Sequence, residues 1–252
     1  MELTQAQRIK DGTNVIRKLE RDDGLTLQVR EVFATIQGEG PHAGLPAVFI
    51  RLSGCHLACM WCDTSWDDEN DNYVSYKDLA EDAFIKWGQC MGSHALPLFV
   101  LTGGEPVRQQ ITPFIEELLR LCPNAIIQVE TAGSFYREVL SNPRVQVVVS
   151  PKTTLVHPVV SRICVGYKYI IRATDKFHKD YGTPISSTQG NTDKPVQLAV
   201  PPSHLQKSSI YLQPCDEGDV NKNSANMHKC YEISMAYGYR IGLQIHKILM
   251  LP

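Results

Sequence analysis

The amino-acid sequence predicts an α/β fold organised around a parallel sheet or a partial (β/α) barrel. Short runs rich in Val, Ile and aromatic residues are typical of strands, and several are apolar throughout, as expected of parallel strands buried on both faces. Helical patterns separate several of these runs, which is the order of elements in a parallel α/β sheet. Because the predicted helices are fewer than the strands, we do not expect a complete eightfold barrel.

The predicted strands extend over most of the chain. They lie at residues 25–33, 47–52, 98–102, 125–130, 145–150, 167–173, 196–200, 209–213 and 240–245. Between them, apolar residues recur at i, i+4 and i+8 over 76–87 and predict a helix with Ser75 as its N-cap. Thr112 and Pro113 are suited to be the cap and first residue of a second helix at 112–121. Two further helices are predicted at 134–140 and 225–237.

Composition places the chain among globular proteins. Of its 252 residues, 43% are hydrophobic and 21% charged, which excludes a disordered or collagen-like chain. The formal net charge of −2 argues against a protein that binds duplex nucleic acid, because such proteins carry a basic excess. The sequence shows neither a membrane-spanning apolar run nor a secretory leader, so we expect a soluble, cytoplasmic protein. The expected organisation is one domain at 25–252, with an N-terminal extension at 1–24 and a loop inserted around 174–195.

The eight cysteines are unevenly placed. Cys55, Cys59 and Cys62 are crowded on one segment directly after an apolar strand, and the other five are scattered. Three thiolates on one loop indicate a metal centre. A structural zinc takes four ligands, usually as two pairs, and no second pair is present. A 4Fe–4S cluster held by three thiolates has one open iron, which suits a cluster that binds a substrate or cofactor directly. A zinc site and three unrelated core cysteines are the alternatives.

The spacing C-x3-C-x2-C on such a loop resembles the radical S-adenosylmethionine (SAM) enzymes, whose fold is an incomplete parallel (β/α) barrel. The resemblance implies that the open iron binds SAM, and that one electron from the cluster cleaves SAM to a 5′-deoxyadenosyl radical. A second motif, LTGGEP at 101–106, follows a predicted strand. Its glycines allow a close backbone approach to a ligand. It is similar to the motif that holds the SAM amino group in these enzymes, with Glu105 near the ammonium.

Further motifs narrow the resemblance. They are FATIQGEG at 33–40, AGLPAVFIR at 43–51, DT at 63–64, SPK at 150–152, QPCD at 213–216, QIH at 244–246 and the final proline. Together they resemble the 7-carboxy-7-deazaguanine synthase family, from about residue 29 to the end apart from the inserted loop. Members convert 6-carboxy-5,6,7,8-tetrahydropterin to 7-carboxy-7-deazaguanine with loss of ammonia, in queuosine-type 7-deazapurine biosynthesis, using SAM, a 4Fe–4S cluster and Mg²⁺. The resemblance also implies a homodimer and an electron donor such as flavodoxin.

The resemblance assigns roles motif by motif, and it makes none of the side chains catalytic because the radical arises on SAM. Its metal ligands are Cys55, Cys59 and Cys62 for the cluster and Thr64 for Mg²⁺. The substrate contacts are Ile36, Gln37, Gly38, Glu39, Arg51, Thr102, His246 and Pro252, where Arg51 offers a forked guanidinium to the substrate carboxylate. The SAM contacts are Trp61, Cys62, Asp63, Gly104, Glu105, Ser150, Pro151, Lys152, Gln213, Pro214, Cys215 and Asp216.

Two other functions share part of this pattern. A glycyl-radical activating enzyme has the same cysteine spacing but acts on a partner protein, and the TIQGEG motif, Arg51 and Thr64 suit a small pterin instead. A non-catalytic iron–sulfur regulator would need neither the LTGGEP nor the SPK motif.

Overall fold

The computed structural model describes residues 21–62, 64, 72–92, 94–188 and 195–251. Its centre is a 9-stranded sheet with the order β11-β10-β7-β6-β5-β4-β2-β1-β3. The strands are β1 (Thr26–Ile36), β2 (Pro46–Leu52), β3 (Asn72–Ser75), β4 (Leu98–Gly103), β5 (Ile126–Thr131), β6 (Val145–Val149), β7 (Gly166–Ile171), β10 (Ile210–Pro214) and β11 (Arg240–Ile241).

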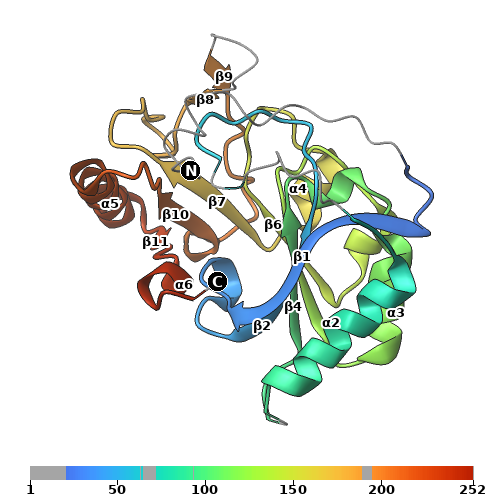
Figure 1. Ribbon diagram of the computed structural model, residues 1–252. Helices are drawn as coiled ribbons and strands as arrows, with labels where there is room; N and C mark the ends of the chain where they lie inside the picture. The colour runs from blue at the N-terminus through green and yellow to red at the C-terminus, as the bar shows by residue number, and fades with distance from the viewer. Residues whose placement is uncertain (1–20, 63, 65–71, 93, 189–194, 252) are drawn as a thin grey trace, which may run out of the picture.

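Most of this sheet is parallel. From β2 to β11 all neighbouring strands run in the same direction, while β1 is antiparallel to β2 and β3 is antiparallel to β1. The sheet is open, with β11 and β3 at its two edges. Figure 1 shows β11 at one of these edges, beside β10. This confirms the predicted α/β fold with an incomplete parallel barrel.

Few helices accompany these strands in the described part of the chain. They are α2 (Tyr76–Cys90), α3 (Thr112–Leu121), α4 (Pro158–Ile163), α5 (Val220–Tyr237) and α6 (Ile245–Ile248), with 3-10 turns η1 (Gly40–His42), η2 (Pro106–Arg108), η3 (Glu138–Ser141) and η4 (Lys207–Ser209). None of these helices combines the length and the apolarity that crossing a membrane requires. The predicted cap of α2 is confirmed, because the Ser75 hydroxyl accepts from the Asp78 N–H at 3.1 Å. The cap predicted for α3 is wrong: Ile111 is the N-cap, and Thr112 is the first helical residue.

The structure corrects several other predicted elements. The helix predicted at 134–140 is reduced to the turn η3, because so short a segment gains few helical hydrogen bonds for the cost of nucleation. The helix predicted at 225–237 begins earlier, at Val220, because the Asp219 side chain caps it by accepting from the N–H groups of Asn221 and Lys222. The strand predicted at 240–245 ends at Ile241, because Gln244 turns into the left-handed region with φ 47°.

The strand predicted at 196–200 lies outside the main sheet. Only part of it is extended, as β9 (Pro195–Gln197), which pairs with β8 (Ser186–Thr188) in a separate two-stranded sheet. The side chains of β9 are exposed or half-buried, and within the predicted run Leu198 is a partly buried residue that packs against the main core. The elements β3, β8, α4 and α6 were not predicted, and each is short; β8 falls within the segment predicted as an inserted loop.

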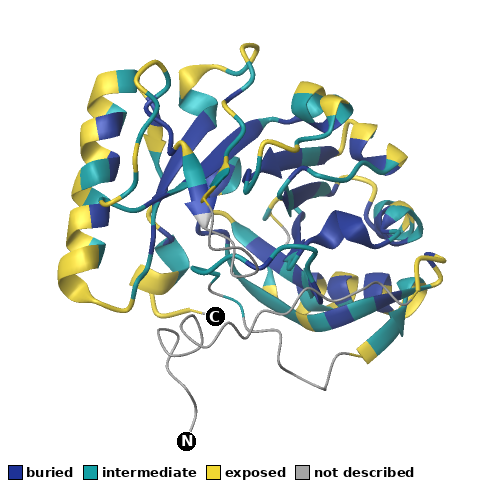
Figure 2. Ribbon diagram, turned by 90° about the horizontal axis from the view of Figure 1, so that it is seen from above, coloured by how far each residue is buried: buried dark blue, intermediate teal, exposed yellow. Residues whose placement is uncertain are grey.

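Alternate residues of the parallel strands face opposite sides of the sheet. On one side, residues such as Ile50 and Leu101 belong to the main hydrophobic core, between the buried strands and the outward-facing helices (Figure 2). On the other side lies a small apolar cluster of Ala47, Leu98 and Val100. Nearer the carboxyl ends this second face becomes polar, with Arg51 of β2 beside Thr102 of β4. The topology therefore gathers polar side chains at the end of the sheet where parallel α/β proteins bind ligands.

Candidate active site

A cavity of about 260 Å³ lies at the carboxyl ends of the parallel strands. The predicted substrate contacts that line it are Gln37, Glu39, Arg51, Thr102 and His246. The predicted SAM contacts that line it are Trp61, Cys62, Gly104, Ser150, Lys152, Gln213, Pro214, Cys215 and Asp216, and the predicted metal ligands are Cys55, Cys59, Cys62 and Thr64. Segments far apart in the chain thus meet in one cavity.

Four of the predicted site residues that the structure describes are not brought to this wall. Ile36, Gly38, Glu105 and Pro151 do not line the cavity. Asp63 and Pro252 lie outside the described residues. Gly38 instead packs beneath the C-terminal segment: a Cβ there would come within 2.1 Å of the His246 Nδ1, and its carbonyl accepts from the Ile245 N–H at 3.3 Å.

The cysteine loop and the LTGGEP motif are in direct backbone contact. The Glu105 N–H donates to the Gly54 carbonyl at 3.0 Å, next to Cys55. A Cβ on Gly104 would lie 2.1 Å from that same carbonyl oxygen, so only glycine permits the approach. Glu105 itself ties two strand ends together, since its carboxylate accepts from the Thr131 hydroxyl at 2.6 Å and the Ala132 N–H at 2.8 Å. Burial raises the pKa of Glu105, and this effect outweighs the hydrogen bonds, which lower it.

The three cysteines of the loop face the cavity with partial exposure. Burial, reinforced by the charge of Glu105, raises the pKa of Cys55 to about 12. A thiolate at this position therefore needs a cation beside it, which a metal centre supplies. Among the described residues no three His, Cys, Asp or Glu side chains are grouped so that they could hold one metal ion. An iron–sulfur cluster takes one thiolate at each iron, so its ligands do not have to meet at a point, and this donor set fits such a cluster.

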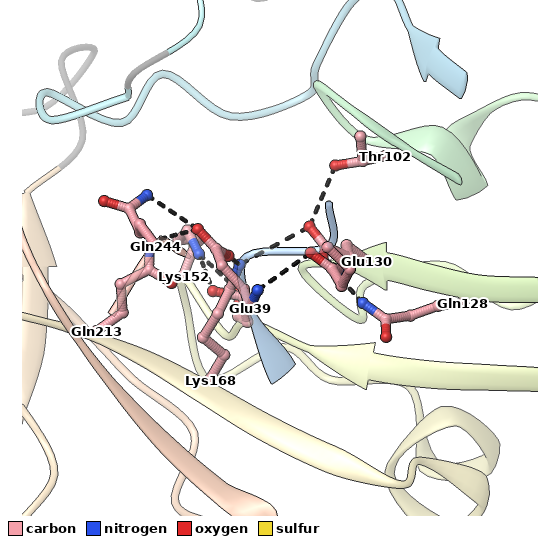
Figure 3. Close-up of polar contacts among 10 residues, drawn as sticks. Glu39, Thr102, Gln128, Glu130, Lys152, Lys168, Gln213 and Gln244 are labelled. Atoms are coloured by element: carbon pink, nitrogen blue, oxygen red, sulfur yellow. Dashed lines mark hydrogen bonds and ion pairs between the residues drawn. The ribbon is translucent and has the colours of Figure 1, made fainter. Parts of the chain in front are cut away.

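Glu39 is the centre of a buried polar network at the floor of the cavity (Figure 3). Its carboxylate forms an ion pair with Lys168 and accepts from the side-chain amides of Gln213 at 2.8 Å and Gln244 at 2.9 Å. Burial alone would raise the pKa of Glu39, but the ion pair and these hydrogen bonds outweigh it and lower the pKa to about 2. Glu39 is therefore an anion across the physiological pH range.

A second carboxylate, Glu130 at the end of β5, continues this network. It accepts from the Gln37 amide at 3.1 Å, the Gln128 amide at 2.9 Å and the Thr102 hydroxyl at 3.3 Å. It also lies 3.8 Å from the Lys168 ammonium. Both carboxylates and Lys168 line the cavity, so a ligand would meet fixed charges there.

Two cationic side chains flank other parts of the wall. The Lys152 ammonium donates to the Ser150 carbonyl at 2.9 Å and lies 5.2 Å from the centre of the Trp61 ring, which joins the SPK motif to the cysteine loop. Arg51 is held by Glu31 at 2.7 Å and lies over the Phe33 ring. These contacts orient both cations without occupying all of their N–H donors.

Sequence reasoning assigned no site role to three polar residues of the floor, namely Glu130, Lys168 and Gln244, although Gln244 belongs to the QIH motif. Lys168 carried the clearest signal, because a lysine inside the otherwise apolar strand YKYII is costly to bury without a partner. Glu130 carried a weaker signal of the same kind, as a charged residue at the end of a predicted strand that is mostly apolar.

Comparisons with known proteins point to one enzyme family. The chain is 33% identical to the 7-carboxy-7-deazaguanine synthase of Rhodospirillum rubrum over 243 aligned residues. The alignment covers 94% of this chain and 98% of the relative. It is 31% identical over 247 residues to the protein of the same name from Rickettsia prowazekii, covering 94% of each. Its fold is similar to the crystal structure of QueE from Escherichia coli, with a TM-score of 0.55 and 23% identity over 86% of this chain and 92% of that one. No protein-family profile matches the chain.

Proposed function

The chain belongs to the family of 7-carboxy-7-deazaguanine synthases, and from that premise we propose that it converts 6-carboxy-5,6,7,8-tetrahydropterin to 7-carboxy-7-deazaguanine with release of ammonia, as a radical SAM lyase. One observation supports this most directly: a single cavity joins the three cysteines of the cluster motif to a floor of fixed carboxylates and amides. The first part suits a cluster with an open iron, and the second suits a small ring rich in N–H groups.

In this proposal Cys55, Cys59 and Cys62 hold a 4Fe–4S cluster, and SAM lies along the wall formed by Trp61 and the SPK and QPCD motifs. The cluster and SAM, when bound, supply abstraction of a hydrogen atom from the substrate. The protein binds and orients both molecules. The stacked rings of Phe33 and Phe49, with centres 5.4 Å apart, line the cavity and limit its contact with water.

We propose that Arg51 binds the substrate carboxylate and that Thr64 is a ligand of the Mg²⁺ ion bound with the substrate. The Arg51 guanidinium faces the cavity and offers a fork that matches a carboxylate. Thr64 lines the cavity two residues after Cys62. One hydroxyl is a sufficient protein ligand for Mg²⁺ if substrate oxygens and waters complete the coordination shell. Such an ion would orient the substrate during the rearrangement.

The resemblance also supports a homodimer, an electron donor such as flavodoxin and a cytoplasmic location as parts of this proposal. All eight cysteines are free thiols, consistent with a reducing compartment. We retain residues 25–252 as one catalytic domain, with the extension at 1–24 and the insertion around 174–195 as additions to it.

The test is anaerobic reconstitution with iron and sulfide, followed by incubation with SAM, a reductant, Mg²⁺ and carboxytetrahydropterin. We expect 7-carboxy-7-deazaguanine and ammonia, detected by mass spectrometry and an ammonia assay. Cys55→Ala should lose bound iron and product. Cys90→Ala, at the exposed end of α2, should keep both and is the matched control. Release of deoxyadenosine with no deazaguanine would instead indicate a radical SAM enzyme with another substrate.

A further inference from the structure

Lys168 is a buried cation that belongs to none of the sequence motifs and has no role assigned to it by them. It lies on β7 between Tyr167 and Tyr169, whose rings belong to the hydrophobic core, and only 9% of its surface is exposed. Its ammonium pairs with Glu39 and lies 3.8 Å from Glu130 (Figure 3). A lysine buried to this degree remains charged only when carboxylates compensate for the loss of water.

The hydrogen bonds of the network use both carboxylates as acceptors, and the ion pair with Lys168 holds Glu39 as an anion. The side chains of Gln213 and Gln244 donate N–H groups to Glu39, and those of Gln37 and Gln128 donate N–H groups to Glu130. A carboxylate is an acceptor only, whereas a protonated carboxyl presents an O–H donor. Two carboxylates and one ammonium leave one net negative charge among these three side chains, open to a ligand that brings N–H donors.

We propose that Lys168 is a positioning residue for the substrate: its ammonium holds Glu39 as an anion beside Glu130, so that the floor of the cavity offers acceptors to the N–H donors of the cyclic guanidine edge of the pterin. This rests on the proposed function for the identity of the ligand. Removal of the ammonium leaves two carboxylates in a buried network, and such pairs retain a proton to relieve their repulsion. The retained proton would place a donor opposite the donors of the ring.

The charges around this network do not replace Lys168. Lys152, on the loop after β6, is a second ammonium that lines the cavity, and it donates to the Ser150 carbonyl. Burial and the charge of Lys168 lower the pKa of Lys152. The remaining charged or titratable groups on the described wall, apart from the cysteines, are Arg51 held by Glu31, His246 beside Gly38, and Asp216 paired with Lys247 at 3.1 Å.

The experiment compares Lys168→Met, Lys168→Arg and Lys86→Met in the reconstituted enzyme between pH 6 and pH 9. Lys86 pairs with Asp82 on the surface of α2 at 2.6 Å and is the matched control. At pH 7, Lys168→Met should lower kcat/KM by about 10- to 100-fold, mainly through KM, because a charge-assisted contact is lost. The loss should diminish as the pH rises and the retained proton leaves. Lys168→Arg should restore most of the activity, and Lys86→Met should match wild type.

Infrared spectra of the same reconstituted proteins supply a readout that needs no turnover. Lys168→Met should show the C=O stretch of a protonated carboxyl at pH 6, and the band should vanish when Glu39→Gln and Glu130→Gln are added. If Lys168→Met has the wild-type pH profile and no such band, the proposal is wrong; Lys168→Gln serves if the methionine variant does not fold. A wild-type enzyme that makes no deazaguanine refutes the proposed function and the substrate part of this proposal, while the infrared band still decides the role of Lys168 in ionisation.

Discussion

The contact between Gly104 and the cysteine loop predicts that Gly104→Ala prevents the cluster from loading. The added Cβ would lie 2.1 Å from the Gly54 carbonyl oxygen, 2.6 Å from its carbon and 3.0 Å from the Cys55 Cβ, whereas ordinary contacts begin at 3.4 Å. The loop would therefore have to retreat by about 1.3 Å, the difference between 3.4 and 2.1 Å. The obstacle is backbone and not the end of a flexible side chain, so the displacement is passed directly to Cys55.

Two magnitudes follow from this displacement. Overpacking of this kind costs about 1–3 kcal/mol, which lowers Tm by roughly 2–12 °C in a chain of this size. The effect on function should be larger, because an error of about 1 Å in a positioned group can cost on the order of 100-fold in rate. Iron content and visible absorbance after anaerobic reconstitution, measured without SAM, separate a displaced cluster ligand from a lost SAM contact.

Gly88→Ala is the matched control for this substitution. Gly88 lies in α2, and a Cβ there would meet nothing within 4 Å. Alanine should therefore stabilise the helix by about 0.5–1 kcal/mol and leave iron content and turnover unchanged. If Gly104→Ala binds iron and turns over like Gly88→Ala, the contact between the two motifs does not position the cluster loop.

Two further substitutions test other parts of the molecule. Ser75→Ala removes the cap of α2 and should lower stability by about 1 kcal/mol, seen as a fall in Tm of about 2–4 °C; an unchanged Tm would show that the hydroxyl contributes nothing. Thr64→Ala should keep the cluster and cleave SAM but lose the stimulation by Mg²⁺, and a normal Mg²⁺ titration would remove Thr64 from the metal site.

The fold was predictable because its signals are local. Short runs rich in apolar residues marked each parallel strand of the main sheet, because a strand covered on both faces carries few polar side chains. The same rule failed at 196–200, where the run is apolar but only Pro195–Gln197 pairs, and it pairs outside the sheet. Pairing depends on which backbone lies alongside, and apolar content alone does not specify that. The short elements β3, α4 and α6 have too few residues to show the periodic spacing of apolar residues that identifies a strand or a helix.

The candidate site was predictable in part. The cysteine loop and LTGGEP were recognisable because each keeps its ligand-binding atoms within a few consecutive residues. Arg51, Thr102, Glu130 and Lys168 instead share a face, each at a position that alternates with the apolar core residues of its strand. The alternation is visible in the sequence, yet the strand order that brings these residues together is not.

The sequence by itself determined what short-range geometry controls: where strands and most helices lie, and that three thiols and two glycines stand on loops at strand ends. Tertiary structure alone decided that Glu39 meets Lys168, 129 positions away, and Gln244, 205 positions away. A buried side chain stays charged only when a group of opposite charge or a hydrogen-bond donor lies next to it. Only the folded sheet brings these partners from distant parts of the chain to Glu39.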